Sequence, residues 1–330
     1  MWAYISRRFL YMVMSLFLLC VTSFIIIQLP PGDYLTSYIT ALQISGEKID
    51  ESEIASLRRQ YGLDMPMYMQ FFRWFGGILR GHFGTSLQWM RPVTEIIGDR
   101  LVLTLLLNLF TVLFTYVVAI AIGVYSATHQ YSIGDHLFTT FGFLGLATPG
   151  FLLALVVMVF FYSVFGMSVG GLFSREFAHA PWSYAKFIDL LKHLPVPIIV
   201  IAVGGTAGLI RVMRGCLMDE LGKQYVITAR TKGLQERKLI FKYPVRVAIN
   251  PMVSTIGWVL PNLVSGGTII ALVLSLPTVG PLLYKALMAE DMHLAGTLVL
   301  FLGFLTIVGT FVSDMLLMVV DPRIRFERSR

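Results

Sequence analysis

LVLTLLLNLFTVLFTYVVAIAIGVY, residues Leu101–Tyr125, decides the fold of this chain, because it carries no charged residue over a length that can cross the hydrocarbon core of a bilayer. About 20 largely apolar residues in helical conformation are enough for one crossing. Other stretches of the chain share this property. The sequence therefore predicts about six transmembrane helices, near residues 9–29, 101–125, 137–165, 194–214, 248–276 and 294–319.

The composition agrees with a lipid environment. The 330 residues are 56% hydrophobic and 14% charged, with a mean hydropathy of +0.74. Soluble domains average roughly 45–50% apolar and about 25% charged residues. These values exclude a water-soluble enzyme and a disordered chain. The two cysteines, Cys20 and Cys216, lie far apart, inside or beside apolar runs, and predict neither a disulfide scaffold nor a metal site.

We therefore predict an all-α polytopic membrane protein. Residues 1–29 form a retained transmembrane anchor, because the apolar run after Arg7 and Arg8 is too long for a signal peptide and ends without a cleavage site. The remaining predicted parts are an extracytoplasmic segment with short helices (30–100), a core of five spans (101–319) with an inner loop (211–246), and a tail (320–330).

Two short helices are expected in the extracytoplasmic segment. One begins near Asp50 and stops at Gly62, and the second opens at Pro66. The second is rich in aromatic residues beside arginines, which suits a helix lying along the membrane interface. A small soluble cap packed on the bundle is the alternative.

The charge distribution predicts the orientation. The net charge is +7, and with the amino terminus in the cytoplasm the inner segments hold a large excess of Lys and Arg over acids, whereas the outer segments are nearly balanced. We therefore expect both termini in the cytoplasm. Loop 126–136 is the exception, because it contains no Lys or Arg. The basic residues do not form a nucleic-acid-binding pattern, so lipid is the expected partner and nucleic acid is not.

Enzyme motifs are nearly absent. Gly222-Lys223 lacks the spacing and the Ser or Thr of a phosphate-binding loop, and no metal-binding motif occurs. Gly166–Gly170 fits the nucleophile pattern of a membrane hydrolase, with Ser168 at its centre and His179 and His193 downstream, but it follows an apolar helix instead of a strand. The sequence thus favours a protein without catalytic residues, resident cofactor or metal.

Polar residues within or beside the spans define a possible translocation path. Asp314 is an acid inside a predicted span, where an ionisable group is costly unless it faces water or a partner. Asn108 and Asn262 are further polar residues that could line a path. For Asp314, a hydrogen bond to a neighbouring helix is an equally weighted alternative.

The inner loop 211–246 is the most distinctive segment. It is rich in Lys and Arg, and its residues up to Gly233 fit a short amphipathic helix that ends at this glycine. A helix that faces the cytoplasm between two spans is suited to docking a partner, and a merely basic inner loop is the alternative.

Tyr225–Leu234, YVITARTKGL, resembles the cytoplasmic loop of ABC importer permeases of the dipeptide and oligopeptide class, which carries a Thr-Ala-Arg-x-Lys-Gly string. Other strings typical of that family occur in the same order along the chain. They are Leu29–Asp33, Tyr61–Pro66, Phe83–Ser86, Thr148-Pro149, Asp314 and Asp321–Arg325.

The resemblance implies the type I ABC importer permease fold and a transport subunit of the bacterial inner membrane. It implies a second, similar permease, two cytoplasmic ATP-binding subunits that bind the ATP, and an extracytoplasmic solute-binding protein as partners. It also implies alternating access driven through a coupling helix, whose residues would be Tyr225, Thr228, Ala229, Arg230, Lys232, Gly233 and Leu234. Arg230 and Lys232 would contact the ATPase.

One departure bears on the solute. Permeases of this family usually carry a Glu after the glycines of the fifth span, and Ala271 stands there in this chain. The resemblance implies import of oligopeptides, with oligosaccharides, opines or nickel chelates as alternatives. A secondary transporter is a more remote one, since neither inverted repeats nor several charged residues in mid-membrane are visible.

Overall fold

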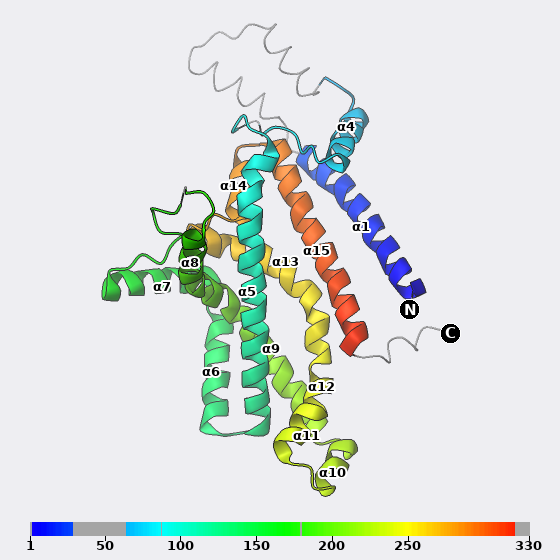
Figure 1. Cartoon of the computed structure of the whole chain (residues 1–330), viewed down its shortest axis with the longest axis vertical. Coiled ribbons are helices and arrows are strands. Elements are labelled where there is room, and N and C mark those ends of the chain that lie inside the picture. Colours follow the sequence, from blue (N-terminus) through cyan, green and yellow to red (C-terminus); the bar gives the residue numbers. More distant parts are fainter. Residues whose placement is uncertain (1, 29–63, 87, 179, 321–330) are drawn as a thin grey trace. The chain divides into compact units, whose positions relative to one another are not determined.

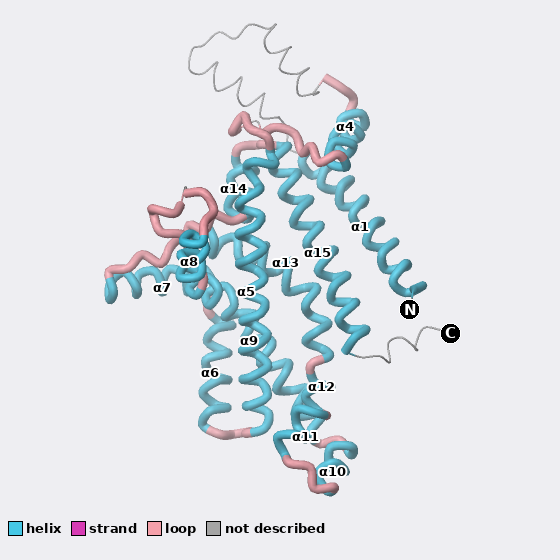
Figure 2. Tube along the Cα trace, viewed as in Figure 1, coloured by secondary structure: helices cyan, strands magenta, loops and turns pink. Residues whose placement is uncertain are grey.

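The structure of the chain, a computed structural model, describes residues 2–28, 64–86, 88–178 and 180–320, and every regular element in these ranges is a helix (Figure 2). The long helices are α1 (Trp2–Gln28), α5 (Val93–Thr128), α9 (Pro195–Leu221), α13 (Asn250–Val273) and α15 (Met292–Val320). The shorter ones are α4 (Met67–Leu79), α6 (Ile133–Ala147), α7 (Gly150–Phe165), α8 (Tyr184–His193), α10 (Gln224–Thr231), α11 (Glu236–Lys242), α12 (Pro244–Ala248) and α14 (Val279–Met288).

Membrane-spanning helices account for most of the described chain. Four helices are long and apolar enough to cross a bilayer, over Ser6–Ile25, Val93–Thr128, Pro195–Leu221 and His293–Leu316, and the bent pair α6 and α7 can supply a fifth crossing. The remaining predicted span, 248–276, coincides with α13. The all-α membrane fold is therefore confirmed.

The span predicted over 137–165 is not one straight helix. It breaks at Thr148 and Pro149, and α6 and α7 meet there at 106°. Pro149 has no N–H to donate and disfavours helical geometry in the residue before it, and Thr148 accordingly adopts an extended conformation. The apolar run predicted a single crossing here, and the sharp bend is compatible with a broken span or with a re-entrant pair of helices.

Two compact units make up the chain. The first contains Leu105–Pro277 and the end of α15 from Val308 onward, and the second contains residues from Ser6 to Thr104 together with Thr278–Ile307. Helices α5 and α15 each contribute one part to either unit.

In the first unit, α9 packs along α6 (Figure 1), and it also contacts α5 through side chains of a shared apolar core. Glycines set the close approaches: a Cβ on Gly123 would lie 2.6 Å from Cβ of Met213, and one on Gly145 would lie 2.6 Å from a methyl of Val203. Side chains of α5, α9, α12 and α13 form an apolar core in this unit. It includes Ala119, Val124, Leu209, Ile210, Met213, Leu217, Val245, Ala248 and Met252.

In the second unit, the loop after α4 is fastened to the start of α15. Ser86 and Asp291 are fully buried, and the Asp291 carboxylate accepts hydrogen bonds from the Ser86 hydroxyl and from the N–H groups of Gln88 (3.2 Å) and Leu294 (3.1 Å). Asp291 thereby caps α15. The Phe83–Ser86 string thus has a structural role in this chain.

Helix α4 begins after Pro66, as predicted. Its Phe71 and Trp74 lie against Phe24 of α1, with ring centroids 5.4 and 5.7 Å apart. Elsewhere on the helix, Phe72 and Leu79 are 66% and 72% exposed. The helix therefore packs on the anchor and also presents an apolar surface, as an interfacial helix does. The helix expected between Asp50 and Gly62 lies outside the described residues.

Candidate coupling site

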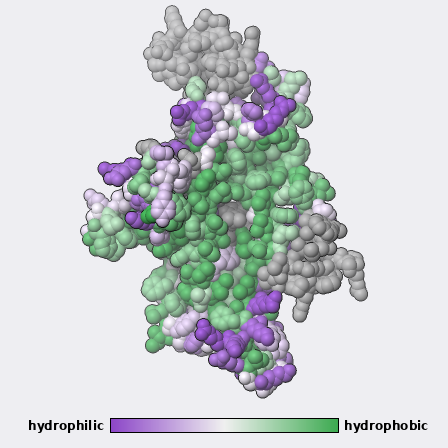
Figure 3. Space-filling view, viewed as in Figure 1, coloured by the Kyte–Doolittle hydropathy of each residue, from purple (hydrophilic) through white to green (hydrophobic). Residues whose placement is uncertain are grey.

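The inner segment folds into a helical hairpin that leads out of one long helix and back into another. Helix α9 continues to Leu221, seven residues beyond the predicted end of the fourth span, and α10 starts two residues after Gly222. Helix α11 follows, and α12 then leads into α13. Figure 3 shows hydrophilic side chains gathered over α10 and α11, in contrast to the apolar surface of the long helices of the same unit.

A small apolar core holds the hairpin together. Val226 and Ala229 of α10 and Leu239 of α11 are buried at 0–7% exposure, and Leu234, Ile240 and Tyr243 pack against them. Val226 and Ala229 are three residues apart and therefore share one face of α10. Of the predicted coupling residues, Ala229 and Leu234 thus stabilise the hairpin from inside.

Gly233 makes the turn possible. Its φ is +79°, a conformation that costs residues with a Cβ roughly 1–2 kcal/mol, and its N–H donates to the carbonyl of Arg230 at 3.0 Å. A Cβ at this position would meet no described atom within 4 Å. Glycine is therefore favoured here by the backbone conformation and not by lack of space, and the predicted helix stop is confirmed.

Arg230 and Glu236 close the hairpin with a two-point ion pair. The Arg230 Nη2–Glu236 Oε1 distance is 2.6 Å and the Nε–Oε2 distance is 3.1 Å. Both side chains are about half exposed, at 48% and 53%. The hydrogen bonds from Arg230 lower the pKa of Glu236, and the same bonds raise the pKa of Arg230. The guanidinium thus ties α10 to α11, a role that sequence reasoning did not assign to it.

A second polar contact joins α10 to the end of α9. The Tyr225 hydroxyl donates a hydrogen bond to a carboxylate oxygen of Glu220. Burial raises the pKa of Tyr225, and the Glu220 carboxylate raises it further. The hairpin is therefore held to α9 by a polar contact as well as by the chain itself.

The other predicted coupling residues face outward. Thr228 and Lys232 are exposed, and Ile227 beside them is 41% exposed although it is apolar. Tyr225, which is 40% exposed, lies three residues before Thr228 and seven before Lys232, so these three residues share one side of α10 and its end, whereas Ile227 lies on another side of the helix. We call Tyr225, Thr228 and Lys232 the docking face.

Sequence reasoning missed the residues that shape this site. They are Glu220, Val226, Glu236 and Leu239, which contribute the hairpin core and both polar ties. The spacing of Val226 and Ala229 was a usable signal for the buried face. No pattern in the sequence pairs Arg230 with Glu236 across the turn.

The residues predicted to line a translocation path are not grouped as clearly as the residues of the hairpin. Asn108 on α5 is 6% exposed, and Asp314 on α15 is half-buried and takes part in a polar interaction. Next to it, the Ser313 hydroxyl donates to the carbonyl of Val253 at 2.9 Å, which joins α15 to α13. The side chain of Asn262 lies outside the described residues. A role in the path stays a prediction for all three.

Catalytic and metal sites find no support in the described residues. These residues contain no group of three or more His, Cys, Asp or Glu side chains placed to hold a metal ion. Ser168 lies in an exposed loop after α7, which ends at Gly166 in a left-handed conformation, so no strand precedes it. His179 lies outside the described residues.

A helical chain with several helices able to cross a bilayer and a polar helical hairpin between two of them is a polytopic membrane protein. A family model described as "Binding-protein-dependent transport system inner membrane component" matches residues 119–326, and a model of the amino-terminal part of such components matches residues 1–108. The chain belongs to this family of inner-membrane transport components.

Relatives match over nearly the whole length. The oligopeptide transport system permease protein AppB of Bacillus subtilis is 32% identical over 98% of this chain and 99% of its own. The inner membrane ABC transporter permease protein YejB of Escherichia coli O157:H7 is 30% identical over 99% and 100%. The glutathione transport system permease protein GsiC of Salmonella paratyphi A is 28% identical over 98% and 99%. This chain is accordingly a multi-pass transport subunit, and ATP hydrolysis belongs to separate subunits.

Proposed function

We propose that this permease imports peptides across the inner membrane by alternating access, and that the α10–α11 hairpin is its docking site for an ATPase. The observation that carries the second part is the position of the hairpin. It continues α9 directly and returns through α12 into α13, so a displacement of the hairpin acts on two long helices at once.

The docking face fits a protein groove. Tyr225 supplies aromatic contact area, and Lys232 adds a positive charge at the end of α10. The core residues and the Arg230–Glu236 pair keep this face in a fixed shape. Such rigidity is needed when ATP-driven closure in a partner is to move the permease, because a loose hairpin would absorb the motion.

The proposed assembly contains a second permease, two cytoplasmic ATPases and an extracytoplasmic solute-binding protein. Both termini and the hairpin lie in the cytoplasm in this arrangement, as the excess of Lys and Arg over acids in residues 211–246 favours. ATP is bound by the ATPases, so this chain needs no cofactor of its own.

Purification from native membranes tests the assembly. We expect tagged chain, solubilised in mild detergent, to bring down a second permease and one or two ATPases, identified by mass spectrometry. Recovery of the chain alone, together with transport that follows an ion gradient and not ATP, would contradict the importer and favour a secondary transporter.

A second candidate solute class rests on Ala271. This residue is 4% exposed in α13, at the position where a carboxylate is expected in peptide permeases. Oligosaccharides, opines or nickel chelates are therefore the alternative cargo. Screening the co-purified binding protein by calorimetry against di- to pentapeptides and these other classes distinguishes them, and binding of a non-peptide alone would overturn the peptide proposal.

A further inference from the structure

Next to the α5–α6 turn, a buried ion pair joins α6 to α9. The guanidinium of Arg214 contacts the Asp135 carboxylate at two points, with Nε–Oδ1 at 3.0 Å and Nη2–Oδ2 at 2.9 Å. Asp135 is 2% exposed, whereas the Arg214 side chain is 27% exposed. Because the carboxylate itself is shielded from water, loss of its partner would be unfavourable.

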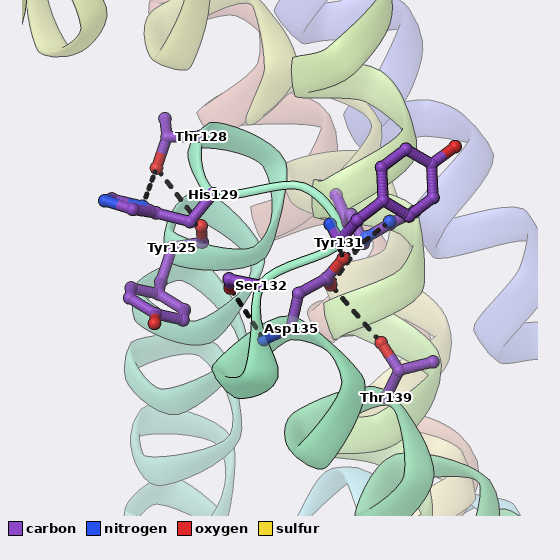
Figure 4. Close-up of polar contacts among 8 residues, drawn as sticks. Tyr125, Thr128, His129, Tyr131, Ser132, Asp135 and Thr139 are labelled. Atoms are coloured by element: carbon purple, nitrogen blue, oxygen red, sulfur yellow. Dashed lines mark hydrogen bonds and ion pairs between the residues drawn. The ribbon is translucent and has the colours of Figure 1, made fainter.

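The same carboxylate organises the turn itself (Figure 4). It accepts hydrogen bonds from the N–H of Tyr131 at 3.0 Å and from the Thr139 hydroxyl at 3.4 Å. Tyr131 has a φ of +63°, an uncommon conformation for an aromatic residue. The N–H of Asp135 donates to the Ser132 hydroxyl at 3.2 Å, so Ser132 caps α6. Asp135 thus fixes the turn, the start of α6 and the link to α9 together.

From this pair toward the bend between α6 and α7, helices α6 and α9 run antiparallel and remain in contact. Cβ of Ala207 lies 3.8 Å from a Cβ placed on Gly142, and the Arg211 guanidinium lies 4.9 Å from the centre of the Phe143 ring. Gly145 approaches Val203 farther along. These other contacts are apolar or cation–π contacts, and the two-point ion pair has the most specific geometry among the contacts named here.

The ion pair is also placed close to the hairpin. Arg214 lies seven residues, about 10 Å along the helix axis, before Leu221, where α9 ends and the hairpin follows. Asp135 lies in the first turn of α6, whose other end is the 106° bend to α7. A displacement of α9 therefore reaches the bend through α6 if the two helices move together.

We propose that Asp135 and Arg214 are positioning residues that make α6 move as one body with α9, so that a motion of the hairpin is passed to the bend between α6 and α7. This inference rests on the proposed function, since it requires that an ATPase moves the hairpin. The tests below distinguish failure of this inference from failure of the proposed function.

The first test measures the α6–α9 distance without any solute. Spin labels are placed on exposed Leu137 of α6 and exposed Asp219 of α9, after Cys20 and Cys216 have been replaced by Ala. In the assembled importer we expect one narrow distance distribution that does not change between the nucleotide-free and the ATP–vanadate states. With Asp135→Asn the distribution should broaden or shift. A wild-type distance that changes with nucleotide, or an unchanged distribution in the variant, would overturn the proposal.

The second test replaces the ion pair with a covalent bond. The 3.8 Å Cβ separation at Gly142 and Ala207 equals the average for a disulfide, so Gly142→Cys with Ala207→Cys should form one on oxidation. In proteoliposomes loaded with ATP, import of a labelled mixture of tri- and pentapeptides is measured together with ATP hydrolysis.

We expect Asp135→Asn to lower import per ATP hydrolysed by about fivefold or more, the usual lower range of coupling effects, while ATP hydrolysis continues. The oxidised disulfide should restore the ratio, and reduction should abolish the rescue in the same sample. Loss of import in the otherwise unchanged chain on oxidation would show that α6 and α9 must slide, and would refute the proposal.

Failure of the proposed function gives a different result. If the assembled complex neither traps vanadate nor hydrolyses ATP, the importer assignment is wrong and the inference falls with it. If it hydrolyses ATP but does not import the peptides, the solute is wrong, and the distance measurement alone decides on Asp135 and Arg214.

Discussion

The hydroxyl of Ser86 donates a hydrogen bond to the carboxylate of Asp291 across two segments that are far apart in the sequence, and both residues are completely buried. The N–H of Trp89 donates to the same hydroxyl at 3.1 Å. Ser86 is therefore the link between the loop that follows α4 and the cap of α15. Around it lies an apolar cluster that includes Val93, Val279 and Leu294.

Replacing this serine should destabilise the second unit. Ser86→Ala leaves one oxygen of the buried Asp291 carboxylate without its hydroxyl donor, at a cost of about 1–3 kcal/mol. We expect a lower melting temperature of the purified complex in detergent. Ser168→Ala is the control, because Ser168 is exposed, and it should change neither melting nor transport. Loss of transport in that control would instead support a hydrolase.

The turn of the hairpin should tolerate no branched side chain. Gly233→Val forces a β-branched residue into a φ near +79°, with a strain of about 1–2 kcal/mol or more. We expect fewer ATPase subunits to co-purify and less import per ATP hydrolysed. Gly222→Val is the matched control, since Gly222 has a φ of −82° and ordinary surroundings. Equal behaviour of the two variants would show that the turn conformation does not matter.

Arg230 can act by holding Glu236 or by contacting an ATPase directly. Exchanging the two charges distinguishes these roles. Arg230→Glu alone places two carboxylates opposite each other and should open the hairpin, lowering import. If Arg230 acts only as a tie, the double variant Arg230→Glu, Glu236→Arg should recover import. Recovery of the fold, measured by limited proteolysis, without recovery of ATPase binding would show direct contact of Arg230 with the ATPase.

The Arg230–Glu236 ion pair should stabilise the hairpin only over a defined pH range. Since the folded-state pKa of Glu236 is below its ordinary value, the stabilisation is present above the ordinary carboxyl range and is lost as the pH falls through the folded pKa. Proteolysis within residues 224–242 should accordingly increase only under acidic conditions. An increase in neutral solution would contradict the tie.

The position of Ala271 should not accept the acid that the resemblance to peptide permeases predicts there. Ala271→Glu places a carboxylate at a position with 4% exposure in a helix of the membrane region, at a cost of about 3 kcal/mol. We expect less folded protein in the membrane, measured by fluorescence-detected gel filtration. Ala185→Glu, at an exposed site on α8, is the control. Full expression of Ala271→Glu with altered solute selection would place Ala271 in the translocation path.

Much of the fold was predictable because the composition and length of an apolar run determine whether it can form a membrane-crossing helix. Apolar runs predicted the spans, and Pro66 and Gly233 predicted a helix start and a helix end that the structure confirms. These features depend on residues close together in the sequence. The end of α9 at Leu221 was missed because Arg211 and Arg214 look like the start of a loop.

The polar contacts of the site were not predictable for a physical reason. The partners in Ser86–Asp291, Asp135–Arg214 and Arg230–Glu236 are chosen by packing, and in the first two pairs they are distant in sequence.

The α5–α6 turn contains no Lys or Arg, and the cation that pairs with its Asp135, Arg214, is made some eighty residues later in translation order. Lys and Arg in short loops bias the orientation of a membrane protein, and its first helix usually dominates. In the proposed topology, Arg7 and Arg8 of the first helix therefore supply the bias that keeps the α5–α6 turn in the cytoplasm until α9 brings Arg214 to Asp135.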